Sequence, residues 1–158
     1  MSLESKFCFW YWATMADGLS SLTRHTSVWT CSVSTILSAV ESISPWLSDI
    51  EQKRFDKFVF EEDRHSYAAG RILLKKVLSH CLTDISPTSW RILPDERGAI
   101  HIDPKQNLSG VNINLSRRRD QVACIVGNRR VGIDIENISR DVDIEGIART
   151  VFTDSESA

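Results

Sequence analysis

A single long amphipathic segment restricts the fold of this chain more than any other feature of the sequence. Residues 61–82 carry apolar side chains at helical spacing, with the acidic Glu61, Glu62 and Asp63 at the N-terminal end. Acidic side chains at the start of a helix interact favourably with its macrodipole, so the pattern predicts one helix over the whole segment. Gly70 lies inside it at a cost of about 1 kcal/mol, which we interpret as space for the close approach of another backbone.

Two shorter helices are predicted before the long one, at 34–44 and 46–55. Ser48 is the expected N-cap of the second, because Glu51 follows three residues later and completes a capping box. A further short helix is predicted at 143–152.

Short strands make up the rest of the predicted structure. Turns are expected at 95–98 and 127–128, where glycine and polar residues gather. A long helix combined with short strands and tight turns predicts an α+β fold. β-Branched, aromatic and alternating patterns place the strands at 26–33, 90–93, 99–102, 111–115, 121–126 and 130–136.

Composition narrows the class of protein. The 158 residues are 42% hydrophobic, which suffices for one globular domain with a core. No run approaches the roughly 18–20 apolar residues that span a bilayer, so no membrane partner is expected. The four cysteines are far apart and form no metal or disulfide pattern, which indicates the reduced thiols of a cytoplasmic protein.

Charge is distributed unevenly along the second half of the chain. Residues 91–130 hold eight basic and four acidic side chains, whereas residues 131–158 hold two basic and seven acidic ones. Nucleic-acid binders usually carry a sustained positive excess, so no nucleic-acid partner is expected. A basic stretch followed by an acidic one suits a phosphate ligand together with a divalent cation; ordinary solvated charge is the alternative.

Two carboxylates stand at alternate positions near the end of the last predicted strand. Val131, Ile133 and Ile135 alternate with Asp134 and Glu136, so a strand here would bury one face and expose both carboxylates on the other. Residues two apart in a strand are about 7 Å apart, close enough for both side chains to reach one Mg²⁺ ion. The alternative is a half-exposed strand whose acidic residues face solvent.

A run of polar side chains ends the strand at 111–115. Asn114 and Ser116 share one face and lead into Arg117 and two further arginines, which together would suit a phosphate. A solvated arginine loop is the alternative. Arg54 and Arg64 could reach a ligand from helices on either side of a cleft, or they could pair with acidic neighbours at the surface.

In their order along the chain, these motifs resemble the 4'-phosphopantetheinyl transferase superfamily. The ordered motifs are Arg54, FVFEEDRHSYAAGRILLKK (58–76), NINLS (112–116) and VACIVGNRRVGIDIE (122–136). The segment 44–76 looks most like the eukaryotic L-aminoadipate-semialdehyde dehydrogenase type of these transferases, which implies a part in lysine biosynthesis. The resemblance as a whole covers roughly residues 26–156. It implies a pseudo-dimer of two α/β halves, each with a long helix packed on a small antiparallel sheet.

The resemblance also implies a reaction and its partners. Such enzymes transfer 4'-phosphopantetheine from coenzyme A to a serine of an apo acyl- or peptidyl-carrier protein, as a holo-acyl-carrier-protein synthase does, and they depend on Mg²⁺. Asp134 and Glu136 match the metal-binding, catalytic positions. The positions that match coenzyme A contacts are Arg54, Arg97, Asn114, Leu115, Ser116 and Arg117.

This sequence departs from the family pattern in three places. Arg117 replaces the histidine of the N-[LIV]-S-H motif, and Ala99 replaces the lysine of the G-K-P turn. The chain ends before the family's W-x-x-K-E-[AS] helix. We therefore expect an N-terminal extension of low order at 1–25, the first half of a transferase at 26–137, and the start of the second half at 138–158.

Two alternatives to an active transferase remain. The chain could be a truncated, catalytically inactive form that keeps only nucleotide or carrier-protein binding, or an unrelated small α+β binding module. If the second half is absent, the face that it would cover is free for self-association, which could rebuild a cleft. No short motif indicates which carrier protein is modified.

Overall fold

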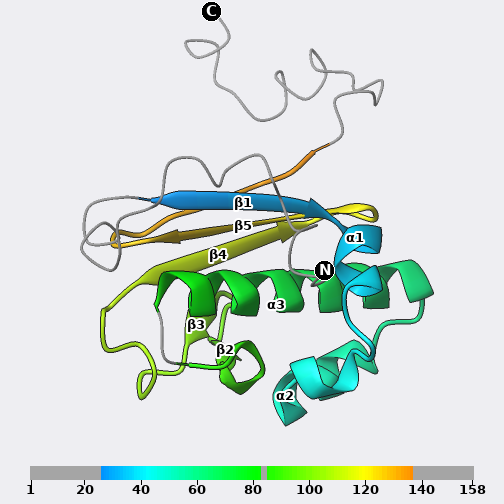
Figure 1. Cartoon of the computed structure of the whole chain (residues 1–158), viewed down its shortest axis with the longest axis horizontal. Coiled ribbons are helices and arrows are strands. Elements are labelled where there is room, and N and C mark those ends of the chain that lie inside the picture. Colours follow the sequence, from blue (N-terminus) through cyan, green and yellow to red (C-terminus); the bar gives the residue numbers. More distant parts are fainter. Residues whose placement is uncertain (1–25, 83–84, 137–158) are drawn as a thin grey trace, which may run out of the picture.

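The computed structural model of the protein describes residues 26–82 and 85–136. Figure 1 shows a sheet with one long helix lying along it and smaller elements around that helix. The elements in chain order are β1 (Ser27–Ser32), α1 (Val33–Ser38), the 3-10 helix η3 (Ser44–Trp46), α2 (Asp49–Phe55), α3 (Glu61–Cys81), the 3-10 helix η4 (Pro87–Ser89), β2 (Ile92–Pro94), β3 (Ile100–Ile102), β4 (Asn112–Arg117) and β5 (Gln121–Gly127).

The main sheet has three antiparallel strands in the order β1-β5-β4. Strand β5 is central: Val126 pairs with Ser27 of β1 on one side and with Ile113 of β4 on the other. Strands β2 and β3 form a separate antiparallel pair joined by the turn predicted at 95–98. In that turn the Gly98 N–H donates to the Asp95 carbonyl at 3.0 Å, which confirms the prediction.

Helix α3 packs on one face of the main sheet and contacts β5 and β4 (Figure 1). Its apolar side chains, such as Ile72 and Leu78, share one core with Val122 of β5 and with Trp90. Gly70 meets the sheet where we expected a close approach, although the neighbour is a side chain: a Cβ at Gly70 would lie 3.0 Å from Leu115 Cδ2. The predicted α+β fold, a long helix on a small antiparallel sheet, is confirmed.

The short helices before α3 begin at their caps. The Ser48 hydroxyl accepts from the Glu51 N–H and the Glu51 carboxylate accepts from the Ser48 N–H, so the predicted capping box is confirmed. The helix predicted at 34–44 is too long, and the helix predicted at 46–55 starts too early, although it ends at Phe55 as expected. Helix α1 ends at Ser38, and α2 begins only at Asp49, because the cap residue Ser48 is extended.

The strand predicted at 130–136 is wrong, because this segment joins no sheet. A strand that follows β5 through a tight turn would pair with β5, but β1 and β4 already occupy both of its edges. The segment instead runs on the side of the sheet opposite α3 (Figure 1). It keeps the predicted alternation, since Ile133 and Ile135 are half-buried whereas Asp134 and Glu136 are exposed.

Several predictions fall outside the described residues: the N-terminal extension at 1–25, the helix at 143–152 and the segment 138–158. The division of the chain at 25 and 137 therefore stays a prediction. Within the described residues, none of the helices combines the length and apolar character needed to cross a membrane.

Candidate functional site

Strand β4 divides the predicted site residues between the two faces of the sheet. Side chains alternate along a strand, so Leu115 and Arg117 face α3, whereas Asn114 and Ser116 face the opposite side. The site therefore has a carboxylate side, away from α3, and an arginine side, next to α3.

The carboxylate side joins two motifs that lie 18 residues apart in the sequence. The Ser116 hydroxyl donates to Asp134 Oδ1 at 2.9 Å, and the Ile135 N–H reaches both that oxygen, at 2.9 Å, and Ser116 Oγ, at 3.1 Å. Glu136 is paired with Arg118, whose Nη1 lies 2.7 Å from Glu136 Oε2. Serine and backbone together fix the Asp134 carboxylate, while both carboxylates stay exposed to solvent.

The arginine side gathers around the ring of Phe58, just before α3. Arg117 donates from Nη1 to Ser66 Oγ at 2.9 Å, and its Cζ lies 4.9 Å from the centre of the Phe58 ring. Arg54 of α2 reaches the same ring, with its Cζ at 5.2 Å. Burial lowers the pKa of Arg117, and the like charges of Arg54 and Arg71 act in the same direction. Two predicted coenzyme A contacts thus meet here.

The remaining predicted residues lie elsewhere. Arg97 is exposed in the turn between β2 and β3, where its N–H donates to Asp95 Oδ1 at 2.8 Å. Asn114 is half-buried on the carboxylate side. The Leu115 side chain packs against Gly70 of α3 and so contributes to the contact between sheet and helix.

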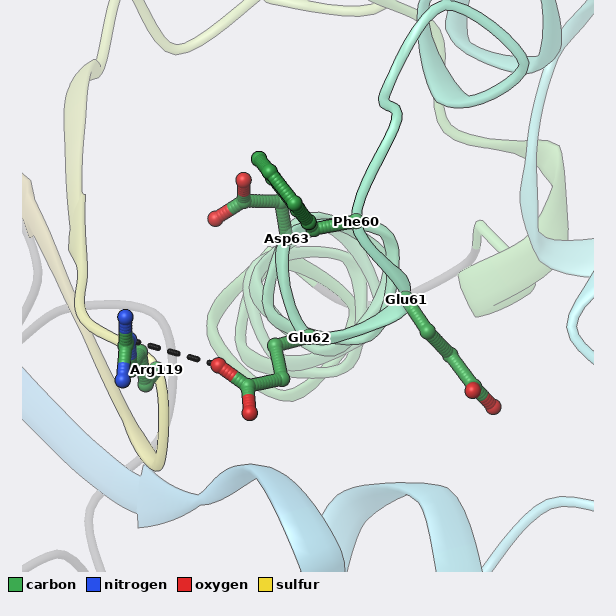
Figure 2. Close-up of a pocket in the computed structure, with 5 residues that line it drawn as sticks. All are labelled: Phe60, Glu61, Glu62, Asp63 and Arg119. Carbon is green, nitrogen blue, oxygen red and sulfur yellow. Dashed lines mark ion pairs between the residues drawn. The ribbon is translucent and has the colours of Figure 1, made fainter.

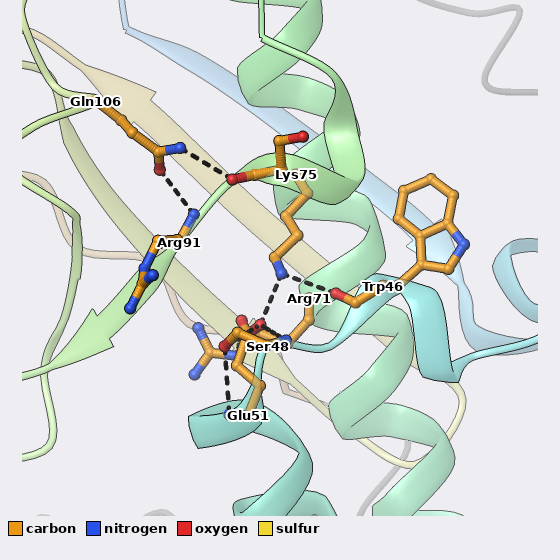
Figure 3. A network of polar contacts seen from close by, with 8 residues as sticks. Trp46, Ser48, Glu51, Arg71, Lys75, Arg91 and Gln106 are labelled. Carbon is orange, nitrogen blue, oxygen red and sulfur yellow. Dashed lines mark hydrogen bonds and ion pairs between the residues drawn. The ribbon is translucent and has the colours of Figure 1, made fainter.

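A buried polar network supports the arginine side, and the sequence analysis missed it. The ammonium of Lys75 donates to Glu51 Oε2 at 2.6 Å and to the Trp46 carbonyl at 2.7 Å, as Figure 3 shows. Arg71, one turn earlier on α3, lies 3.7 Å from the other oxygen of Glu51. These contacts hold α2, and with it Arg54, against α3. The sequence does contain a signal for this network, because Arg71 and Lys75 lie four residues apart on the apolar stripe of the long helix. Cations are rarely buried unless they are paired, so two of them on this stripe indicate a buried acidic partner.

A pocket of about 470 Å³ opens at the N-terminal end of α3 (Figure 2). Its lining is Phe60, Glu61, Glu62, Asp63 and Arg119. Arg119 is paired with Glu62 at 3.3 Å, which leaves two further carboxylates in the lining. A pocket with this excess of negative charge disfavours a phosphate ligand, and none of the predicted site residues lines it.

Comparison with known proteins identifies the family. A family model described as "4'-phosphopantetheinyl transferase, N-terminal" matches residues 27–129, about two thirds of the chain. The chain belongs to the 4'-phosphopantetheinyl transferase family. The matched range contains all six predicted coenzyme A contacts, whereas Asp134 and Glu136 follow it.

Two curated relatives carry the same family name. The chain is 27% identical over 142 residues to the 4'-phosphopantetheinyl transferase HetI of Nostoc sp., covering 89% of this chain and 60% of the relative. It is 30% identical over 114 residues to the 4'-phosphopantetheinyl transferase gsp of Aneurinibacillus migulanus, covering 72% and 45%. The chain thus spans about half the length of these relatives.

Proposed function

We propose that this chain takes part in the transfer of 4'-phosphopantetheine from coenzyme A to a serine hydroxyl of a carrier protein, with Mg²⁺ as the cofactor. The observation that carries the proposal is the bond between Ser116 and Asp134, which brings the serine of one family motif to the carboxylate of another at 2.9 Å. The family membership and the two named relatives support it.

The carboxylate side fits a magnesium ion. Mg²⁺ binds oxygen ligands, and in phosphate sites it takes one or two carboxylates together with waters and phosphate oxygens. Asp134 and Glu136 are exposed, and Asp134 is held in place by two donors on one oxygen. Within residues 26–82 and 85–136, no group of three or more histidine, cysteine or acidic side chains is placed to hold a metal ion. Asp134 and Glu136 would therefore need waters and phosphate oxygens to complete the coordination of Mg²⁺.

The arginine side suits the phosphates of coenzyme A. Arg54 and Arg117 are permanently charged, and their planar guanidinium groups donate paired hydrogen bonds to phosphate oxygens. The ring of Phe58 holds both side chains in place before a ligand binds. Arg117 stands where the family motif has a histidine, and it supplies a longer reach and more donors at the same position.

The reaction needs alignment and charge neutralisation more than new covalent chemistry by the enzyme. The serine oxygen of the carrier protein bonds to the phosphorus of the phosphopantetheine, the bond from that phosphorus to the bridging oxygen breaks, and adenosine 3',5'-bisphosphate leaves. A base takes the serine proton. When bound, Mg²⁺ neutralises charge on the pyrophosphate. Asp134 and Glu136 would hold the ion, and the arginines would hold the nucleotide.

The test is the intact mass of an apo carrier protein after incubation with the chain, coenzyme A and Mg²⁺. A gain of one phosphopantetheine, abolished by EDTA, is the expected result. Asp134→Ala should abolish the gain, whereas Glu41→Ala, which removes an exposed carboxylate far along the chain from the site, should leave it unchanged. Equal activity of Asp134→Ala and the parent chain would refute the metal assignment.

The inactive alternative predicts a different pattern. If the chain binds coenzyme A but adds no mass to the carrier protein, while a full-length relative does so in the same assay, it is a binding form only. Sedimentation velocity tests the predicted self-association. Self-association and the cytoplasmic location both stay predictions.

A further inference from the structure

The three consecutive arginines that end and follow β4 reach three different parts of the molecule. Arg117 faces α3, as described above. Arg119 is paired with Glu62 of α3 at 3.3 Å. Arg118 turns to the other face of the sheet, because side chains alternate along an extended chain, and its Nη1 atom donates to Glu136 Oε2 at 2.7 Å. Arg118 is therefore the one of the three that enters the carboxylate side.

The backbone of Arg118 is fixed in the turn between β4 and β5. Its N–H donates to the Gln121 carbonyl at 2.8 Å, and the Gln121 N–H donates back to the Arg118 carbonyl at 3.3 Å. The Arg118 side chain is 31% exposed, whereas that of Glu136 is 65% exposed. The ion pair thus ties an outlying carboxylate to a cation whose own position is set by the sheet.

The same carboxylate is a metal ligand in the proposed function, so Mg²⁺ and Arg118 compete for it. Mg²⁺ binds carboxylate oxygens at about 2.1 Å, which would place the ion about 5 Å from a guanidinium on the same group. Cations at that distance repel each other, and physiological salt, with a Debye length of about 8 Å, screens the repulsion only in part. An exposed ion pair stabilises its geometry only weakly. Repulsion of the ion therefore outweighs any gain from orienting Glu136.

We propose that Arg118 is a built-in competitor of Mg²⁺: it holds Glu136 and must leave this carboxylate before the ion binds there, which lowers the metal affinity of the site. This inference rests on the proposed function, because it takes Asp134 and Glu136 as the metal ligands. Arg118 acts through Glu136, so it is a positioning residue and not a ligand of the ion.

The test measures Mn²⁺ binding to the whole chain, without coenzyme A or carrier protein, from the electron paramagnetic resonance signal of the free ion. Mn²⁺ suits the same oxygen ligands as Mg²⁺. Arg118→Met should raise the affinity about tenfold, roughly fivefold from the lost repulsion and twofold from the ion pair that no longer has to break. Arg118→Lys keeps the charge, and Arg119→Met removes the neighbouring arginine that pairs with Glu62 instead. Both controls should stay within about twofold of the parent chain.

The salt dependence of the difference distinguishes charge from packing. Because salt screens the repulsion, the tenfold difference between Arg118→Met and the parent chain should shrink to about threefold between 0.05 and 0.5 M NaCl. A difference that stays the same at both salt concentrations would overturn the inference.

The outcomes separate this inference from the function on which it rests. If no variant binds Mn²⁺, or if Asp134→Ala leaves binding unchanged, both are removed. If Asp134→Ala abolishes binding but Arg118→Met binds no more tightly than the parent chain, the inference alone is overturned. An equal gain in Arg118→Met and Arg118→Lys would also overturn it, because the charge would not be responsible. Arg118→Leu serves as the second neutral variant if circular dichroism shows that Arg118→Met does not fold.

Discussion

Replacement of Lys75 by methionine tests how strongly one buried ion pair holds α2 to α3. The Lys75 side chain is fully buried, and its ammonium has two close partners, Glu51 Oε2 at 2.6 Å and the Trp46 carbonyl at 2.7 Å. Methionine has a similar volume and no charge. It would fill the space, but it would leave the Glu51 carboxylate buried without its nearest cation.

The expected loss follows from what Glu51 retains. Breaking a buried pair by removing one partner costs about 3–5 kcal/mol, because an uncompensated charge stays buried. Here Glu51 Oε2 keeps the N–H and the hydroxyl of Ser48, at 2.9 and 3.0 Å, and Arg71 remains 3.7 Å from Oε1. We therefore expect the lower end of that range, a loss of about 3 kcal/mol in the free energy of unfolding.

Urea unfolding followed by circular dichroism measures this loss. With a slope of about 1.5–2 kcal/mol per molar urea, the midpoint should fall by about 1.5–2 M. The double variant Glu51→Gln/Lys75→Met should cost about 1–2 kcal/mol less than the sum of the single variants, since it removes both charges. Lys57→Met, at an exposed lysine just after α2, should change stability by less than about 0.5 kcal/mol. A loss below about 1 kcal/mol for Lys75→Met, or an additive double variant, would refute the reasoning.

Three further predictions address the core and the site. Gly70→Val should lower the free energy of unfolding by about 1–3 kcal/mol, because its Cβ would lie 3.0 Å from Leu115 Cδ2; an unchanged melting temperature would contradict this close approach. Burial raises the pKa of the Cys81 thiol to about 11. Alkylation of Cys81 in the native protein should therefore stay slow at pH 8 and accelerate only near pH 11, whereas in the unfolded protein it should accelerate near pH 9. Equal alkylation rates of Cys81 in native and unfolded protein at pH 8 would show that this thiol is accessible. Ser116→Ala removes the hydroxyl that donates to Asp134 and should weaken Mg²⁺ binding about tenfold, as measured by calorimetry. Ser109→Ala, at an exposed serine, is the control. Equal Mg²⁺ affinities of Ser116→Ala and the parent chain would mean that the serine does not orient the carboxylate.

Local signals in the sequence predicted most of the elements correctly. The long helix was expected at 61–82 and occupies Glu61–Cys81, and the cap at Ser48 forms as its spacing from Glu51 indicated. Caps, turns and periodicity depend on neighbours within about four residues, and the sequence contains all of that information. The family motifs likewise predict Asp134 and Ser116 as site residues, which stays a prediction. The hydrogen bond between them could not be predicted from either motif alone.

The strand expected at 130–136 was wrong for a reason that no local pattern contains. Apolar and acidic residues do alternate in this segment, and their exposure to solvent alternates with them. A segment becomes a strand only where a sheet has a free edge to pair with, and β1 and β4 already occupy both edges of β5. The same holds for the pairing of Lys75 with Glu51, 24 residues away in sequence, which requires α2 to lie against α3.

The sequence by itself determined the long helix, the capped short helix, the turn at 95–98 and the family, because each depends on residue order and short-range spacing. Only the tertiary structure decided on which face of the sheet each predicted site residue lies. The pleat of β4 sends Ser116 toward Asp134 and its neighbour Arg117 toward Phe58 on the opposite face. The packing of α2, α3 and β4 then gathers Arg54, Arg71 and Arg117 around the rings of Phe58 and Tyr67, because charges distant in sequence interact only where the packed core places them together.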